Sequence, residues 1–307
     1  MNNIKTLVTG ATGFIGSHLV PKLSTNHQVA TLNARTVSNS NTEWHQAVDD
    51  CDVLIHLAGR AHVSSNNSLA ESDIYQIINT ELTCVLAERL AKQSSKHIIF
   101  VSTAVVFGTV SNPNQPFRTS DIPNPDGPYA QSKIEAENAI IKICEKTSLT
   151  YTIIRPPLVY GPNVRANFLS MLKWVNAGVP LPLGKTQNLR SLVGIRNLVD
   201  LIENCMTNPD ASNKIFNVSD NHDLSTTDLL NVIASAMNKK SKLIPIPPIF
   251  LKFASELIRK PRAYEGLCES FQLNVSETSE DLSWVPPYSL QQEIDETVRW
   301  FQTEIKR

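Results

Sequence analysis

Three glycines between a predicted strand and a predicted helix constrain the fold of this chain more than any other feature. The segment VTGATGFIG places Gly10, Gly13 and Gly16 three residues apart, directly after a short apolar, β-branched run. Phe14 and Ile15 begin the apolar pattern of the helix that follows. Glycines allow a tight turn and bring backbone N–H groups against a pyrophosphate at a positive helix end. This context predicts a dinucleotide-binding loop; a purely structural turn is the alternative.

Short apolar runs alternate with amphipathic helical patterns through the first half of the chain. The predicted strands are 5–10, 28–34, 52–59, 97–104 and 150–161, with helices at 74–93 and 129–147 between them. Near-continuous apolar strands separated by helices indicate a parallel sheet covered on both faces. We therefore predict an α/β fold, a Rossmann-type doubly wound parallel sheet with right-handed connections.

The pattern changes after residue 162. Helices are predicted at 167–178 and 197–207, strands at 190–195 and 214–220, and a further helix after Ser225 and Asp228, which stand at capping-box-like spacing. We expect a dinucleotide-binding domain over 1–162, to which 188–220 contributes. A smaller mixed α/β lobe, mainly substrate-binding, is expected over 163–307.

Composition argues against several classes of protein. The net charge of −1 over 307 residues gives no basic surface for nucleic acid. No segment approaches the roughly 20 apolar residues of a membrane span, so we predict no membrane insertion. The most apolar stretch, 243–258, is broken by three prolines, and we expect a loop leading into a packed helix. The N-terminus lacks signal-peptide features. The five cysteines have no metal-ligand spacing, so we expect free thiols and no metal. Free thiols and the missing signal peptide together predict a cytoplasmic location.

The segment GPYAQSK places Tyr129 four residues before Lys133. Pro128 suits the first position of a helix, and residues i and i+4 lie on one helix face. The phenol and the ammonium should therefore point the same way from the first turns of a helix. Because this spacing is common by chance, the pair alone does not identify a catalytic site.

The end of the second predicted strand bears on the choice between NAD and NADP. An acid there would bond the adenosine ribose and repel a 2′-phosphate. Asn33 stands in that place, and Arg35 follows with a charge that could pair with the phosphate. A simply solvated Arg35 is the alternative. The cofactor stays open between the two, with a lean to NADP or to tolerance of both.

Six further segments stand in order along the chain: HLAG (56–59), NTELT (79–83), VSTAVVFG (101–108), YAQSK (129–133), RPPLVYGP (155–162) and NLRSLVGIRNLVDLI (188–202). With the glycine loop, they make nearly the whole chain resemble the extended branch of the short-chain dehydrogenase/reductase superfamily. Within that branch it is similar to the NAD-dependent epimerase/dehydratase family, and to its UDP-glucose 4-epimerase-like members.

The resemblance implies catalytic roles for three residues. Tyr129 would be the acid/base, Lys133 would favour the phenolate and bond the nicotinamide ribose, and Thr103 would hold the reacting sugar oxygen, with Ser102 as the alternative. A phenol has an ordinary pKa of about 10, so nearby positive charge is needed to make it a base. The expected cofactor-binding residues are Gly10, Gly13, Phe14, Ile15, Gly16, Arg35, Leu57, Ala58, Gly59, Ser102, Tyr129, Lys133 and Pro156.

The resemblance also implies substrate contacts beside Thr103. Arg190 would grip a nucleotide diphosphate, and Asn167 lies at a predicted helix start whose N–H groups suit phosphate. Asn79 would lie near the reacting sugar, or would instead satisfy a helix kink. Arg165 is a further candidate, with a solvated side chain as the alternative. Leu158 departs from the family, which often has a substrate-contacting asparagine there.

Three functions follow as hypotheses. The first is a 4-epimerase of UDP-glucose or UDP-N-acetylglucosamine with tightly bound NAD. The second is an NADPH-dependent reductase of a UDP-4-keto-6-deoxy-hexosamine in surface polysaccharide precursor synthesis. The third is a non-catalytic dinucleotide sensor, which the intact Tyr129, Lys133 and Thr103 set disfavours. A dehydratase is disfavoured because Ala104 and Val105 replace an Asp-Glu pair. A UDP-sugar is the expected partner, and a homodimer is left open.

Overall fold

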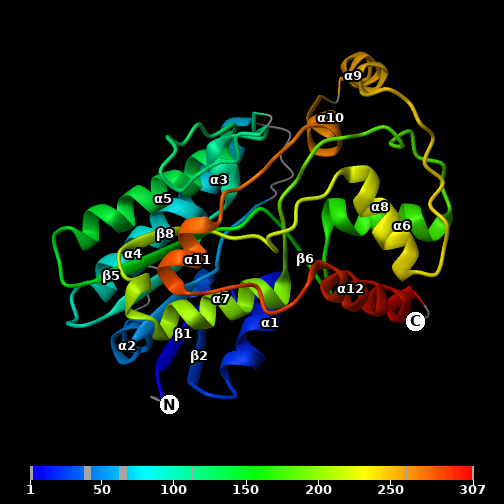
Figure 1. Ribbon diagram of the computed structural model, residues 1–307. Coiled ribbons are helices and arrows are strands. Elements are labelled where there is room, and N and C mark those ends of the chain that lie inside the picture. The colour runs from blue at the N-terminus through cyan, green and yellow to red at the C-terminus, as the bar shows by residue number, and fades with distance from the viewer. Residues whose placement is uncertain (1–2, 38–42, 62–67, 113, 260, 306–307) are drawn as a thin grey trace.

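The computed structural model describes residues 3–37, 43–61, 68–112, 114–259 and 261–305 (Figure 1). Six parallel strands form the central sheet in the order β2-β1-β3-β4-β5-β8. They are β1 (Lys5–Thr9), β2 (Gln28–Leu32), β3 (Val53–His56), β4 (His97–Val101), β5 (Thr150–Arg155) and β8 (Lys214–Asn217). The prediction of a doubly wound α/β sheet is confirmed.

Alternate residues of each strand enter two different cores, because successive side chains point to opposite faces of a sheet. On one face, Val8, Ile55 and Ile99 pack with α1 (Phe14–Leu23) and α7 (Ile195–Thr207). On the other face, Leu7, Leu54 and Ile98 pack with the remaining sheet helices. These are α2 (Glu43–Asp50), α4 (Leu82–Leu90) and α5 (Pro128–Cys144). The near-continuous apolar strands of the sequence therefore reflect burial on both sides.

A third core lies among helices of the C-terminal half. Phe168, Leu230 and Ile294 are fully buried there, on α6 (Ala166–Ala177), α8 (Thr226–Ala236) and α12 (Leu290–Ile305). The two-stranded parallel sheet of β6 (Leu158–Tyr160) and β7 (Leu192–Gly194) joins this lobe to the main sheet. The remaining helices are α3 (Ser68–Tyr75), α9 (Pro248–Leu257), α10 (Pro261–Cys268) and α11 (Ser276–Leu282). Short turns of helix are η1 (Ala34–Thr36), η2 (Gln76–Glu81), η3 (Ala104–Phe107) and η4 (Pro209–Ala211).

The sheet ends at β2, where a Rossmann sheet usually has one more strand beyond it. In the described part of the segment between β2 and β3, residues 43–50 form the helix α2, whose Trp44 and Val48 are buried. The described residues between β2 and β3 contain no strand. The adenine end of a dinucleotide would therefore meet a shorter sheet edge.

The expectation of a packed helix within 243–258 is wrong. Only Ser255 of α9 is buried, whereas Phe250 and Phe253 are each 63% exposed and Leu257 is 86% exposed. Figure 1 shows α9 standing away from the body of the lobe, next to α10. The physical reason is that α6, α8 and α12 already fill the lobe's core, and the extended Pro247 leads the chain out over the surface.

The cysteines are free thiols, as expected, although Cys84 and Cys268 are only half-buried. Burial raises the pKa of Cys51, Cys144 and Cys205 to about 12. Such thiols are poor nucleophiles at neutral pH. Within the described ranges, no helix has the length and apolar character needed to cross a membrane.

A buried ion pair ties α5 to the central sheet. Arg155, at the end of β5, donates from Nη2 to Glu137 Oε2 at 2.6 Å and from Nε to both carboxylate oxygens at 3.2 Å. Glu137 is fully buried and Arg155 is 3% exposed. Ser102, just after β4, donates its hydroxyl hydrogen to the same carboxylate. The middle of α5 is therefore held at the carboxyl ends of β4 and β5.

Glu137→Ala should lower the free energy of unfolding by about 3–5 kcal/mol, because it leaves the Arg155 charge buried without its partner. The matched control is Asp281→Ala, which removes one half of the exposed Lys214–Asp281 pair and should cost less than about 1 kcal/mol. Urea denaturation followed by circular dichroism measures both. Similar small losses in the two variants would contradict the structural role assigned to Glu137.

Candidate active site

The glycine loop is built from close backbone approaches that exclude side chains. Gly10 has a φ of +72°, and a Cβ there would lie 2.7 Å from Ala58 N. A Cβ at Gly16 would lie 2.3 Å from the Gly10 carbonyl oxygen. Gly13 donates its N–H to Gly10 O at 2.9 Å and caps α1 without a side chain. The first turn of α1 thus presents backbone N–H groups that no side chain caps, which suits an anion.

The residues after β3 lie beside this loop. Leu57 N donates to Thr9 O at 3.3 Å, and Ala58 N donates to the Thr9 hydroxyl at 3.2 Å. A Cβ at Gly59 would lie 3.1 Å from Asn79 Oδ1 and 3.9 Å from Lys133 Nζ. Phe14 and Ile15 are half-buried on α1 and pack against the core on the sheet face that α1 and α7 cover. The predicted cofactor residues around the glycine loop and β3 therefore meet at the carboxyl edge of the sheet, where such folds bind ligands.

Asn33 and Arg35 lie at the carboxyl end of β2, next to the glycine loop's strand. Asn33 Oδ1 accepts a hydrogen bond from Arg35 N at 3.1 Å, which caps η1. The side chain of Arg35 is exposed, and it forms no ion pair with another described residue. The adenosine end of the groove thus carries a cation and no carboxylate from these two positions.

Tyr129 and Lys133 project from the first turns of α5, which begins at Pro128 as the sequence predicts. The Tyr129 hydroxyl is hydrogen-bonded to Thr103, and its ring centroid lies 5.9 Å from that of Tyr75. Lys133 is 5% exposed and donates to Val101 O at 2.9 Å, with Nζ 3.9 Å from the Phe100 ring centroid. The three predicted catalytic residues therefore converge at the end of β4.

Burial dominates the electrostatics of this pair. It raises the pKa of Tyr129 above its ordinary value, although the hydrogen bond from Thr103 opposes the shift. It lowers the pKa of Lys133 to about 7, although the charge of Glu137 opposes this change. The protein alone therefore holds the phenol protonated. An additional positive charge is needed beside Tyr129 before it can act as a base near neutral pH.

Ser102 and Thr103 are adjacent but face different partners. The Ser102 hydroxyl donates to Glu137, beneath α5. Thr103 bonds Tyr129 and also accepts from Val105 N at 3.4 Å. This geometry favours Thr103 over Ser102 as the hydroxyl that meets substrate. Pro156 is buried behind them, and its carbonyl accepts from Ala104 N at 2.8 Å.

Asn79 lies in η2, a π-helical segment between α3 and α4. Its Oδ1 accepts from Arg60 N at 2.8 Å, and its Nδ2 donates to Arg60 O and to the Ser132 hydroxyl. Both interpretations of Asn79 have support here. It bonds backbone groups at an irregular helix, and it also lies beside Lys133 and Gly59, near the predicted catalytic residues. Wide helical turns of this kind are frequent at functional sites.

His56 is a site residue that the sequence reasoning did not single out. It is fully buried, and its ring nitrogens bond Thr9 at 2.6 Å and Thr83 at 2.9 Å. Burial, aided by the charge of Lys133, lowers its pKa to about 3, so the ring is neutral. His56 thus links the strand before the glycine loop to α4, which directly follows the η2 segment that carries Asn79. The motif HLAG contained the signal, since a histidine ending a buried strand needs polar partners.

The predicted substrate residues Arg190 and Asn167 lie in the C-terminal half of the chain. Arg190 donates from Nη1 to Glu269 O at 2.9 Å, with its guanidinium 5.7 Å from the Phe271 ring centroid. Burial lowers its pKa to about 10, so it stays charged at neutral pH. Asn167 and Arg165 are exposed at the start of α6. Leu158 is exposed on β6 and supplies no polar group there.

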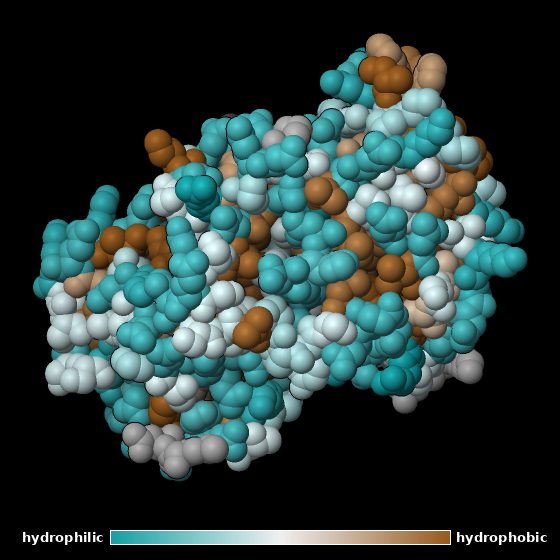
Figure 2. Space-filling model, viewed as in Figure 1, coloured by the Kyte–Doolittle hydropathy of each residue, from teal (hydrophilic) through white to brown (hydrophobic). Residues whose placement is uncertain are grey.

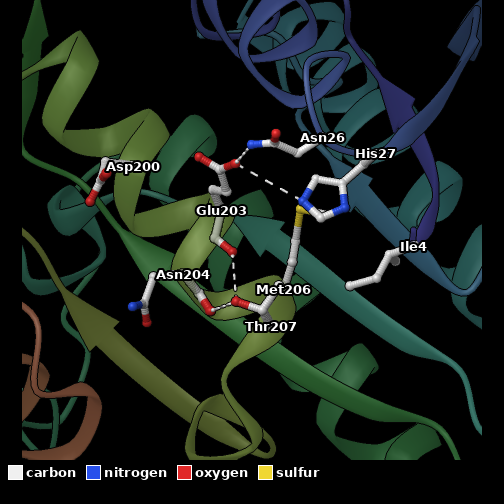
Figure 3. A pocket seen from close by; sticks show the side chains of 8 residues that line it. All are labelled: Ile4, Asn26, His27, Asp200, Glu203, Asn204, Met206 and Thr207. Carbon is white, nitrogen blue, oxygen red and sulfur yellow. Dashed lines mark hydrogen bonds and ion pairs between the residues drawn. The ribbon is translucent and has the colours of Figure 1, made fainter. Parts of the chain in front are cut away.

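A hollow of about 590 Å³, shown in Figure 3, is lined by none of the predicted site residues. Its walls include Ile4 and His27, which precede β1 and β2, and Glu203 on α7, which lies 4.0 Å from the His27 ring. This is the amino-terminal edge of the sheet. Because parallel sheets bind ligands at the opposite edge, this hollow does not belong to the candidate active site.

Comparison with known proteins identifies the family. The model of the NAD dependent epimerase/dehydratase family matches residues 6–219, which include the glycine loop and the three predicted catalytic residues. This chain belongs to that family. It is 36% identical over 310 residues to a UDP-glucose 4-epimerase of Vibrio cholerae, covering 96% of this chain and 94% of that relative.

Two further similarities cover nearly the whole chain. An N-acetyl-α-D-glucosaminyl-diphospho-ditrans,octacis-undecaprenol 4-epimerase of Escherichia coli O157:H7 is 25% identical, covering 97% of this chain and 95% of that relative. The crystal structure of a UDP-glucose 4-epimerase of Thermotoga maritima with UDP-glucose superposes with a TM-score of 0.76. It is 23% identical, and the match covers 98% of this chain and 99% of that one. The structural likeness establishes the shared fold.

Gly16→Ala should weaken dinucleotide binding at least roughly tenfold, because the added Cβ forces the loop away from α1. The matched control is Gly266→Ala, where a Cβ meets nothing within 4 Å. Titration calorimetry with NAD and with NADP measures the affinity, and circular dichroism checks the fold. Unchanged affinity in a folded Gly16→Ala protein would contradict the assignment of this loop.

Proposed function

We propose that this protein is a 4-epimerase of UDP-glucose or UDP-N-acetylglucosamine. The observation that carries the proposal is the convergence of Tyr129, Thr103 and Lys133 beside a glycine loop that only glycine can form. The 36% identity to a UDP-glucose 4-epimerase over nearly the whole of both chains supports the substrate class. The site residues fit a nicotinamide dinucleotide, because the uncapped start of α1 suits its pyrophosphate.

Each member of the trio has a distinct task in this proposal. Thr103 holds the sugar O4 within reach of the Tyr129 oxygen, and Tyr129 removes the O4 proton and later returns it. Lys133 bonds the nicotinamide ribose and adds positive charge beside the phenolate. A bound dinucleotide would supply the hydride acceptor and donor for C4 and a positive charge that favours the phenolate. Burial keeps water from the keto sugar between the two transfers.

Arg190 and Asn167 complete the proposed site as diphosphate ligands. Arg190 now holds the carbonyls at the end of α10, Glu265 O at 3.4 Å and Glu269 O at 2.9 Å. A diphosphate offers a planar guanidinium stronger, charge-assisted bonds than these carbonyls. Substrate binding would then exchange the α10 contacts of Arg190 for phosphate contacts. A cytoplasmic location and a homodimer remain part of the proposal.

Tyr129→Phe should lower turnover at least roughly a hundredfold while dinucleotide affinity stays the same, as expected for a positioned acid/base. Tyr151→Phe makes the same chemical change on β5 and should keep nearly full activity. A coupled assay of UDP-glucose conversion measures both. Near-wild-type turnover of Tyr129→Phe would remove this residue from the mechanism.

A second candidate function has one specific observation in its favour. The exposed Arg35 and the absence of an acid at Asn33 suit the 2′-phosphate of NADPH. An enzyme that keeps its NAD bound through both hydride transfers has no use for a site that distinguishes NADP from NAD. The alternative is therefore an NADPH-dependent reductase of a UDP-4-keto-6-deoxy-hexosamine in surface polysaccharide precursor synthesis. It uses the same Tyr129, Lys133 and Thr103.

Redox balance separates the two functions. An epimerase returns the hydride it removes, so it should convert UDP-glucose or UDP-N-acetylglucosamine to the 4-epimer without added cofactor, and the denatured protein should release NAD. NMR of the anomeric proton follows the epimer. No epimer, together with one NADPH oxidised per 4-keto sugar reduced, would establish the reductase instead. Asn33→Asp should then raise the KM for NADPH through charge repulsion.

A further inference from the structure

The outer face of α9 is an exposed apolar surface. We define it by Ile249, Phe250, Phe253, Leu257 and Ile258, whose exposed fractions run from 53% to 86%. Figure 2 shows apolar side chains at this place, at the top of the molecule where Figure 1 labels α9. Scattered apolar residues are normal on protein surfaces, but a contiguous group on one projecting element marks an interaction site.

The amphipathic pattern of α9 is turned outward. Leu251 packs against the core of the C-terminal lobe, and Ser255, one helical turn later, is the buried residue of the helix. Ile249, Phe253 and Leu257 follow one another at i+4 spacing on the opposite side and carry the larger apolar groups. A helix that served only to cover its own lobe would present these groups to the core. The sequence of α9 therefore specifies a second environment outside the chain.

The charge around α9 identifies that environment. Residues 248–262, which comprise α9 and the start of α10, contain four lysines and arginines and a single acid, Glu256, whereas the whole chain has a net charge of −1. The basic residues are Lys252, Arg259, Lys260 and Arg262. Those that the structure describes are exposed. One acid pairs with this group across the fold, since Arg262 lies 3.6 Å from Asp126.

Apolar aromatic side chains next to a cluster of basic residues are the signature of a helix that lies in a membrane surface. The apolar groups enter the boundary of the acyl chains, and the basic groups meet lipid phosphates within a Debye length. A second copy of this chain would oppose an equally basic α9, and like charges disfavour such a contact. The charge complementarity thus favours an anionic bilayer over self-association.

We propose that the outer face of α9 docks this protein on the surface of an anionic lipid bilayer. The docked helix would lie close to the candidate active site. α10 follows α9 directly, its Arg262 contacts Asp126 just before α5, and its Glu265 accepts from the Thr109 hydroxyl at 3.2 Å. The helix that carries Tyr129 is therefore one short helix away from the membrane face. Docking does not depend on which sugar the enzyme converts.

Vesicle flotation of the full chain tests this proposal. Vesicles of phosphatidylcholine alone are compared with an equal mixture of phosphatidylcholine and phosphatidylglycerol. The wild-type protein should float with the anionic vesicles at low salt, stay behind with the neutral ones, and be released as salt rises. The double variant Phe250→Ser/Phe253→Ser should bind the anionic vesicles at least roughly tenfold more weakly. Because both phenylalanines are exposed, the variant should keep the melting temperature and the turnover of soluble substrate.

Val285→Ser is the matched control, since Val285 is 69% exposed and lies away from α9. It should float like the wild-type protein. The proposal is overturned if the wild-type protein ignores anionic vesicles at low salt, or if the double variant binds as tightly as the wild-type. It is also overturned if light scattering shows a wild-type dimer that the double variant splits, because a second copy would then cover α9. These readouts are independent of epimerase activity.

Discussion

The buried pair of Glu137 and Arg155 fixes the helix that carries Tyr129 and Lys133 against the central sheet. Its carboxylate is bonded by Arg155 from β5 and by Ser102 after β4, so α5 is attached to two strand ends at once. This attachment engages Ser102 below the helix and leaves Thr103 to meet Tyr129. A buried ion pair is costly to desolvate and is not needed for stability alone. Here it sets the geometry on which the rest of the site is built.

Dehydration then sets the chemical state of the site. Lys133 lies among Phe100, the Val101 carbonyl and the neutral His56, so its charge is only weakly stabilised and its pKa falls to about 7. The same burial keeps Tyr129 protonated. Protein groups alone thus favour the protonated phenol. In the proposed function, a bound cation beside Tyr129 would favour the phenolate, so proton transfer would depend on cofactor binding.

The C-terminal half combines a structural role with an outward one. α6, α8 and α12 form its core, and α10 reaches back to the start of α5 through Arg262 and Asp126. Leu251 of α9 packs against that core, whereas Phe250 and Phe253 of the same helix are exposed. The lobe therefore contacts the segment before α5 through α10 and presents a separate apolar and basic face to the surroundings.

Local sequence determined the elements whose causes are local. The spacing of Gly10, Gly13 and Gly16, the proline before Tyr129 and the apolar strands each act over a few residues, so the loop, the helix start and the sheet could be predicted. Tertiary structure alone decided what depends on residues far apart in the chain. Ser102 meets Glu137, Arg190 holds α10, and His56 joins two elements only because the fold brings these partners together. Whether α9 is buried was likewise undecidable from its apolar sequence, because burial depends on whether the lobe's core has room for it.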